Sequence, residues 1–151
     1  MAYSGVVKPA NKIMAGGSPL EQELKIENAT SMYPGRLVKK GTNDDDVVVN
    51  TAAGATLGWL GYEQTNPAFM PTDVDTIYAL DDVAAVLYGG SFLIVGSLAS
   101  GQNVTKGARL KAAADGELAA GVVGTDEIVA IAEESVDATS AAADIVVLSL
   151  I

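Results

Sequence analysis

The stretch Val83–Leu98, VAAVLYGGSFLIVGSL, contains two apolar runs that are separated by a pair of glycines. The runs, Val83–Tyr88 and Phe92–Leu98, have the length of strands and contain the branched and aromatic side chains that strands favour. Gly89-Gly90 between them is a strong hairpin signal, because the favoured two-residue turns need positive φ angles. The stretch therefore predicts a β-hairpin and a β-rich protein.

The same pattern of short apolar runs and turn signals extends from Arg36 to the end of the chain. Short apolar runs alternate with turn signals such as Gly41-Thr42-Asn43, Ser100-Gly101-Gln102 and Asp115-Gly116. Many short strands at this spacing are typical of an all-β sandwich or a small barrel. We therefore predict a mainly β fold, a small β-barrel or sandwich with at most short helices. The expected strands lie at 36–39, 47–50, 56–62, 76–80, 83–88, 92–98, 108–112, 117–123, 128–132 and 145–151.

One segment also fits a helix. Residues 72–88 place apolar side chains on one side of a helix, with Thr72 as its cap and Gly89 as its stop. Two strands that break at Asp81-Asp82 fit better, because the second of them would then pair across Gly89-Gly90.

A short phrase occurs twice in the chain. Lys39-Lys40-Gly41 leads into Val47-Val48-Val49, and Lys106-Gly107 leads into Leu110-Lys111-Ala112. Each copy continues into a turn of small residues. Two copies of a strand–turn–strand unit suggest a duplicated half-barrel.

Residues 1–35 differ from the rest of the chain because they are poorly periodic and rich in proline and glycine. Such a segment cannot bury much apolar area by itself. It is either a flexible tail or an extended arm that orders against a partner, and Leu20–Glu27 within it fits a short strand or a helical turn. We predict an extended N-terminal arm at 1–35 and a β-rich domain at 36–151 that folds without residues 1–34.

The composition restricts the possible functions. The chain has no histidine and no cysteine, the side chains that most often carry acid–base, thiol and transition-metal chemistry at neutral pH. Its net charge is −10, and residues 51–151 hold 3 basic and 13 acidic residues. Nucleic acids and anionic membranes need clustered Lys and Arg, so we expect neither as a partner.

The chain has no obvious membrane or export segment. No stretch reaches the roughly 18 apolar residues that are needed to cross a bilayer. Residues 1–17 lack the apolar segment of a secretory signal. We therefore expect synthesis in the cytoplasm and retention there.

Acidic clusters are the remaining candidates for chemistry. Asn43–Asp46 groups three carboxylates in a loop, but calcium loops place their ligands in alternating register, so a solvated turn fits better. Glu133 and Glu134, with Asp137 nearby, come with no identifiable nucleophile or cleft. We predict no catalytic residue, no metal site and no cofactor.

Aromatic residues give the candidates for packing and interfaces. Trp59 is the only tryptophan and is flanked by glycines, a setting in which tryptophan is most often a core or interface anchor. We therefore predict that its side chain is buried, either in the core or between subunits. The candidate interface residues are Tyr33, Pro34, Trp59, Tyr62 and Phe92.

From Val83 to Ile151 the chain resembles the capsid decoration, or cement, proteins of tailed bacteriophages and archaeal viruses. The resemblance rests on the apolar runs around Gly89-Gly90, Ser97-Leu98-Ala99 with Gly101-Gln102, Val104–Gly107, Leu110–Gly116, Ala130–Glu134, Val136–Thr139 and the terminal Ile145–Ile151. Residues 36–63 repeat part of this pattern.

The resemblance implies a β-tulip-like domain without enzymatic activity that binds the outer surface of a viral shell. It implies the major capsid protein as partner, and homotrimers that clamp neighbouring capsomers through several linked contacts. It also implies an N-terminal segment that orders on the shell by strand addition, and a location on the capsid exterior of the virion.

Two functions of other classes stay open. A tail-fibre or cell-surface β-module that binds carbohydrate needs an exposed aromatic residue for stacking, which would be Trp59 or Tyr62. A carboxylate-dependent hydrolase would depend on Glu133 and Glu134.

Overall fold

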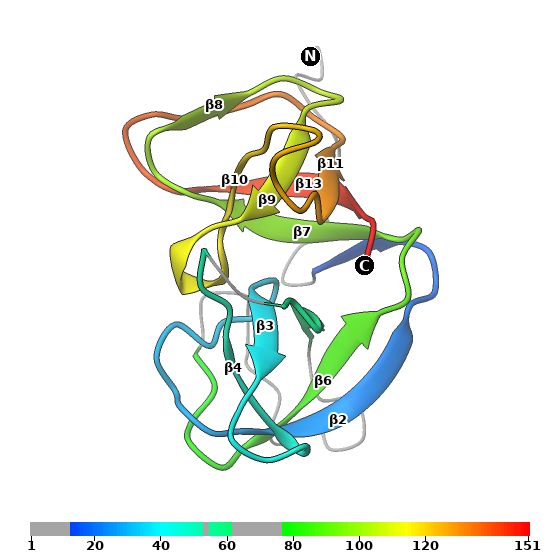
Figure 1. Ribbon diagram of the computed structural model, residues 1–151, viewed down its shortest axis with the longest axis vertical. Helices are drawn as coiled ribbons and strands as arrows, with labels where there is room; N and C mark the ends of the chain where they lie inside the picture. Colours follow the sequence, from blue (N-terminus) through cyan, green and yellow to red (C-terminus); the bar gives the residue numbers. More distant parts are fainter. Residues whose placement is uncertain (1–12, 53–54, 62–76) are drawn as a thin grey trace, which may run out of the picture.

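The computed structural model describes residues 13–52, 55–61 and 77–151, and within them the strands form two small barrels (Figure 1). The mainly β fold with a small barrel is thus confirmed. Helical structure in these ranges is limited to the 3-10 turn η2 (Ala114–Gly116). None of the described ranges contains a helix that is long and apolar enough to cross a membrane.

The N-terminal barrel is a closed ring in the order β2-β4-β3-β5-β6. β2 pairs antiparallel with β6 along most of its length, and a short parallel pairing with β4 closes the ring. The strands are β2 (Leu20–Ile26), β3 (Leu37–Lys40), β4 (Asp46–Val49), β5 (Gly58–Leu60) and β6 (Val83–Tyr88). The interior holds Leu24, Ile26, Met32, Val38, Val47, Leu60, Tyr78, Ala84 and Val86.

The C-terminal barrel is a second ring, in the order β7-β10-β9-β11-β13, which closes because β13 pairs with the whole of β7. Its strands are β7 (Leu93–Leu98), β9 (Arg109–Ala112), β10 (Leu118–Ala120), β11 (Ala130–Ala132) and β13 (Ala143–Ser149). β1 (Met14–Gly16) pairs with the first half of β7, and β8 (Gln102–Val104) pairs with β12 (Val136–Ala138) in a separate ribbon.

Three strands of the N-terminal barrel, β3, β5 and β6, contribute buried side chains to both cores. Successive side chains of a strand point to opposite sides, so Leu60 fills the N-terminal barrel while Trp59 belongs to the core of the C-terminal barrel. Val86 and Leu87 of β6 divide in the same way. Strands that are covered on both faces have continuous apolar sequences, which explains the unbroken runs in β5 and β6.

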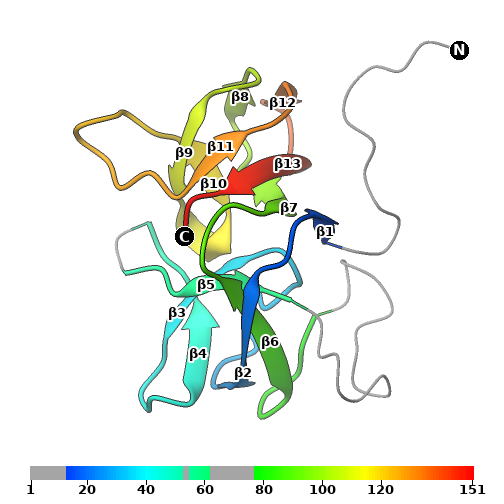
Figure 2. The same cartoon turned by 90° about the vertical axis from the view of Figure 1, so that its right-hand side faces the viewer.

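Gly89-Gly90 does not form the predicted hairpin turn. β6 pairs with β2 and β5, whereas β7 pairs with β1, β10 and β13, so the two strands do not pair with each other. The glycines, with φ angles of 102° and 75°, instead carry the chain from one barrel to the other (Figure 2). Gly90 N–H donates to the carbonyl of Ile151 over 2.8 Å, which fixes this crossover. The prediction was wrong because a hairpin and a crossover need the same positive φ angles.

Residues 13–35 belong to the folded body, and the predicted boundary at Arg36 needs correction. β1 pairs with β7, and β2 is a full strand of the N-terminal barrel. β2 buries Leu24 and Ile26, but Leu20–Glu23 are exposed, so its alternation is too short to be visible in the sequence. Of the predicted arm, residues 1–12 lie outside the described residues.

The other predicted strands are present with one exception. Each expected run contains a strand except 76–80, of which residues 77–80 form a loop before β6 and residue 76 lies outside the described residues. A helix through residues 77–88 is therefore wrong as well. The repeated phrase does not mark equivalent units, because Lys39-Lys40-Gly41 ends a strand of the β3–β4 hairpin, whereas Lys106-Gly107 joins β8 and β9, which do not pair.

Candidate functional site

A cavity of about 280 Å³ lies where the two barrels meet. Tyr33, Pro34 and Arg36 line it from the segment that precedes β3, and residues 95–97 of β7 and Asp144 of β13 line it from the C-terminal barrel. Two of the predicted interface residues, the neighbours Tyr33 and Pro34, thus lie at a junction with strands that are far from them in the sequence.

The segment at residues 33–36 is fixed by backbone hydrogen bonds to β5. Gly35 N–H donates to the carbonyl of Leu60 over 2.7 Å, and Leu60 N–H donates to the carbonyl of Arg36 over 2.8 Å. Pro34 is buried and Tyr33 is half-buried as a result. This wall of the cavity is therefore built by the barrel itself rather than by a loose loop.

Arg36 links the two barrels electrostatically. Its guanidinium lies 5.5 Å from the centre of the Tyr33 ring and donates to the Glu117 carboxylate over 2.8 Å and to the Asp115 carbonyl over 3.0 Å. The side chains of Arg36 and Glu117 are each only 17% exposed, so the pair is better shielded from water than a surface ion pair. Because its charge is balanced inside the protein, Arg36 does not make the cavity a site for anions.

Trp59 is buried, as predicted, with 0% of its surface exposed. Its indole Nε1–H donates to Ser149 Oγ over 2.9 Å, and that hydroxyl donates to the carbonyl of Ile151 over 2.7 Å. Gly96 of β7 leaves the room for the ring, since a Cβ atom at this position would lie 3.0 Å from the indole. Trp59 therefore joins the two barrels from inside and offers no face on which a sugar ring could stack.

The other two candidate interface residues have different positions. Phe92 is 1% exposed and belongs to the same core as Trp59, so it gives packing within the chain. Tyr62 lies outside the described residues. Of the four candidate interface residues that the structure describes, Tyr33 alone is partly exposed.

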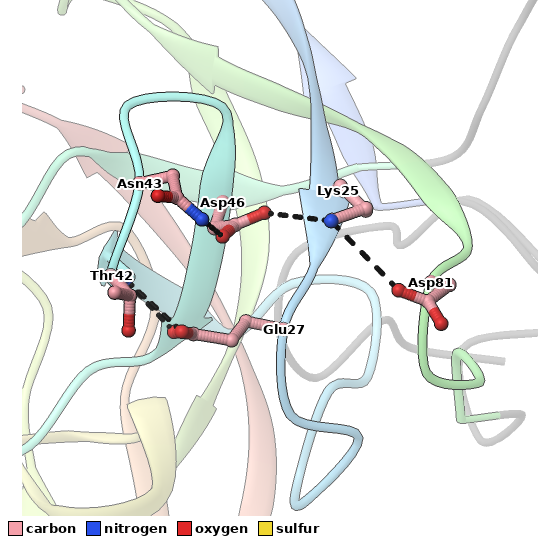
Figure 3. Close-up of polar contacts among 6 residues, drawn as sticks. All are labelled: Lys25, Glu27, Thr42, Asn43, Asp46 and Asp81. Atoms are coloured by element: carbon pink, nitrogen blue, oxygen red, sulfur yellow. Dashed lines mark hydrogen bonds and ion pairs between the residues drawn. The ribbon is translucent and has the colours of Figure 1, made fainter.

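The acidic turn Asn43–Asp46 joins β3 to β4 at the end of the N-terminal barrel away from the C-terminal barrel (Figure 1), and Figure 3 shows its polar contacts. Asp46, which is only 3% exposed, accepts a hydrogen bond from the Asn43 side chain over 2.7 Å and forms an ion pair with Lys25 over 3.3 Å. Lys25 also lies 3.9 Å from Asp81, and Glu27 accepts from Thr42 N–H over 3.0 Å.

These contacts give the turn a structural role. The hydrogen bond from Asn43 lowers the pKa of Asp46, and Lys25 acts in the same direction. In return the hydrogen bond and charge of Asp46 raise the pKa of Lys25. Within residues 13–52, 55–61 and 77–151 no group of three metal-ligating side chains occurs, and the turn itself is stabilised by a cation of the protein.

The carboxylates considered for a hydrolase are engaged in similar contacts. Glu133 lies 3.7 Å from Lys106, and the buried Glu134 accepts a hydrogen bond from Val146 N–H of β13 over 2.9 Å. Asp137 accepts from the hydroxyl of Thr139 over 2.7 Å, which lowers its pKa. All three carboxylates thus stabilise turns and strand ends of the C-terminal barrel.

One exposed surface was missed in the sequence. The run 117–123 was expected to be a strand, but β10 ends at Ala120, and Val122 and Val123 lie in the loop that follows. They are 61% and 70% exposed. Two valines between Gly121 and Gly124 were the available signal, because glycines on both sides favour a turn over a continued strand.

The comparisons with known proteins agree with a structural role. The model of one protein family, described as XM1 gp53 minor capsid protein, matches residues 3–150 and so includes both barrels. No curated protein matches the chain.

Proposed function

The chain belongs to the XM1 gp53 minor capsid protein family, and from this premise we propose that it is a non-enzymatic decoration protein that clamps neighbouring capsomers. Membership makes it a capsid-associated structural protein of a phage virion. The proposal adds that it binds the outer surface of the shell, that its partner is the major capsid protein, and that it acts as a homotrimer.

The observation that carries the proposal is the core shared by the two barrels. Trp59 and Leu87 of the N-terminal barrel pack with Ile94 and Leu110 of the C-terminal barrel in one continuous cluster. Interiors of this kind are close-packed and deform little. A rigid body with two separate barrels can touch two neighbouring subunits of a shell and transmit force between them, which is what a clamp requires.

The homotrimer follows from the resemblance to decoration proteins and from the logic of linked contacts. Several weak contacts that are joined in one oligomer bind far more tightly than each one alone. Residues 1–12, which lie outside the described residues, are the part of the predicted arm that remains available for a contact with the shell in this proposal.

The test compares particles of the phage with particles that lack this chain. We expect mass spectrometry of wild-type particles to find the chain at close to one copy per major capsid protein. We expect particles without it to release their DNA at a lower temperature. Purified chain added to these DNA-filled particles should bind and restore the release temperature, which would place it on the outside.

Three results would contradict the proposal. A handful of copies per particle would indicate a tail or fibre component, and an unchanged release temperature would exclude a clamp. Failure of added chain to bind filled particles would exclude the outer surface. The mass of the chain released from particles, measured by sedimentation, then decides between a trimer and other states.

A further inference from the structure

The loop between β10 and β11, residues 121–129, presents two valines to solvent. Val122 and Val123 are 61% and 70% exposed, more than any other large apolar side chain in the described residues. A Cβ atom built on Gly124, the next residue, would meet no atom within 4 Å. Figure 2 shows the loop extending away from the body of the C-terminal barrel.

Asp126 holds this loop in one conformation. Its carboxylate accepts a hydrogen bond from Val122 N–H over 2.8 Å and pairs with Lys111 of β9 over 3.1 Å. Its own N–H donates to the carbonyl of Val122 over 2.9 Å, so the residue closes the turn from both sides. The hydrogen bond from Val122 also lowers the pKa of Asp126, which keeps the carboxylate charged. At the base of the loop Gly121 N–H donates to the carbonyl of Arg109 over 2.8 Å.

The valines do little for the fold, because most of their surface is in water. An apolar pair on an exposed turn gains free energy when a partner covers it, and loops that a rigid scaffold positions often carry function. In this protein the contacts of Asp126 hold the turn in one conformation without a partner. A preorganised contact loses little conformational entropy on binding, so it binds more tightly than a loose loop with the same side chains.

The partner that covers Val122 and Val123 must offer more surface than the same two valines of a second copy of the chain. Two valine side chains offer far less than the roughly 800 Å² per partner that a stable dimer buries. Glu127 beside the two valines is also exposed, so two copies that met at this loop would bring like charges together. A contact of this size works as one of several on a larger surface.

We propose that the Val122-Val123 tip inserts into an apolar socket on the major capsid protein and is a principal shell contact of this chain. The proposal rests on the proposed function. It further assigns the socket a neutral or basic rim, because Glu127 beside the tip is exposed and Asp126 is already paired with Lys111.

The test measures binding of purified chain to shells from particles that lack it, using the doubly substituted Val122→Ser, Val123→Ser chain. We expect its affinity to fall by about tenfold or more, because two apolar side chains lose their burial. Asp126→Asn keeps the shape of the side chain but weakens its contacts with Val122 N–H and Lys111, so it should lower the affinity by about threefold. The thermal midpoint of the double variant should stay that of the wild type, since both side chains are exposed.

Leu80→Ser is the matched control, because Leu80 is 58% exposed but lies in the turn before β6, on the other barrel. It should bind shells like the wild type.

If the wild type binds and the double variant binds equally well, the tip is not the contact, and the proposed function stands. If the double variant binds normally but sediments as a smaller oligomer, the valines join copies of the chain, which overturns the proposal. If the wild type itself does not bind shells, the proposed function fails and this inference fails with it.

Discussion

The two barrels have the same number of strands in their rings but depend on each other unequally. Among the residues that the structure describes, the interior of the N-terminal barrel is a cluster of nine buried residues, whereas the core of the C-terminal barrel has eighteen and includes side chains from both barrels. β3, β5 and β6 of the N-terminal barrel are therefore covered on their outer face by the C-terminal barrel. The smaller barrel depends for its stability on the larger one, and the larger one needs the smaller to cover its core.

The two barrels also differ in the partners of their buried polar side chains. In the N-terminal barrel, Asp46 is buried at the end away from the junction, where it pairs with Lys25, whereas Asn50 is buried past the other end of β4, where its carbonyl accepts a hydrogen bond from Gly116 N–H over 2.9 Å. In the C-terminal barrel, Glu134 and Ser149 are buried and bond to β13 or to Trp59. Asp46 makes the stability of the N-terminal barrel depend on a charge. Asn50 and Ser149 help to hold the two barrels together, and Glu134 bonds within the C-terminal barrel.

The largest expected effect comes from removing β2. A chain without residues 2–34 loses the burial of Leu24, Ile26 and Met32, at about 1.5–3 kcal/mol each, and the strand that closes the ring. That sum is comparable to the whole stability of a typical domain, so we expect the N-terminal barrel not to fold. Circular dichroism and denaturant unfolding measure this directly.

The matched control is a chain without residues 2–12, which retains every contact described above. It should unfold like the full chain. A chain without residues 2–34 that still unfolds cooperatively with the same strand content would show that the N-terminal barrel does not need β2.

The next effect tests the junction. Trp59→Ala should lower the free energy of unfolding by about 3–5 kcal/mol and Leu60→Ala, one residue further, by about 2–5 kcal/mol. Because Trp59 faces the other barrel, we expect its loss to separate unfolding into two transitions. Leu60 faces the interior of its own barrel, so its loss should keep the barrels coupled.

Amide hydrogen exchange, followed separately for β2–β6 and for β7–β13, distinguishes the two results. Equal loss of protection in both barrels for Trp59→Ala would mean that the indole does not couple them.

The smallest effect concerns pH. A carboxyl whose pKa is lower in the folded than in the unfolded state stabilises the fold above the unfolded value of about 3.9, and this stability is lost as the pH falls through the lower value. Asp46 is such a group, and so are Asp126 and Asp137. We expect the thermal midpoint of the wild type to fall as the pH is lowered from 5 towards 2.

Asp46→Asn should be less stable than the wild type at pH 7 and should lose less as the pH falls. Asp44→Asn is the control, because its side chain lies in the same turn and is 100% exposed. If Asp46→Asn shows the same pH dependence as the wild type, Asp46 contributes nothing to acid sensitivity.

The sequence predicted the candidate site only in part, because the contacts of a side chain depend on which distant strands cover it. The burial of Trp59 was predictable, because a tryptophan among glycines in an apolar run has the character of an anchor. Its contact with Ser149, ninety residues away, was not. Tyr33 and Pro34 meet β7 only because two rings close side by side, and the Val122-Val123 tip is exposed only because β10 ends early.

The sequence by itself determined the secondary structure of most of the chain. Apolar runs of strand length and turns with glycine are local properties, so β3–β7, β9–β11 and β13 fall where the runs lie. The apolar runs in β5 and β6 agree with the burial on both faces that the structure shows for most of their residues.

Only the tertiary structure decided which strands pair. Gly89-Gly90 satisfies the backbone of a hairpin and of a crossover equally, and the choice depends on whether β6 gains more from β7 or from β2 and β5. β2 buries few apolar side chains, and it is ordered because β6 and β4 supply its backbone partners. Strand pairing joins residues that are far apart in the chain, and its free energy comes from contacts that no local pattern contains.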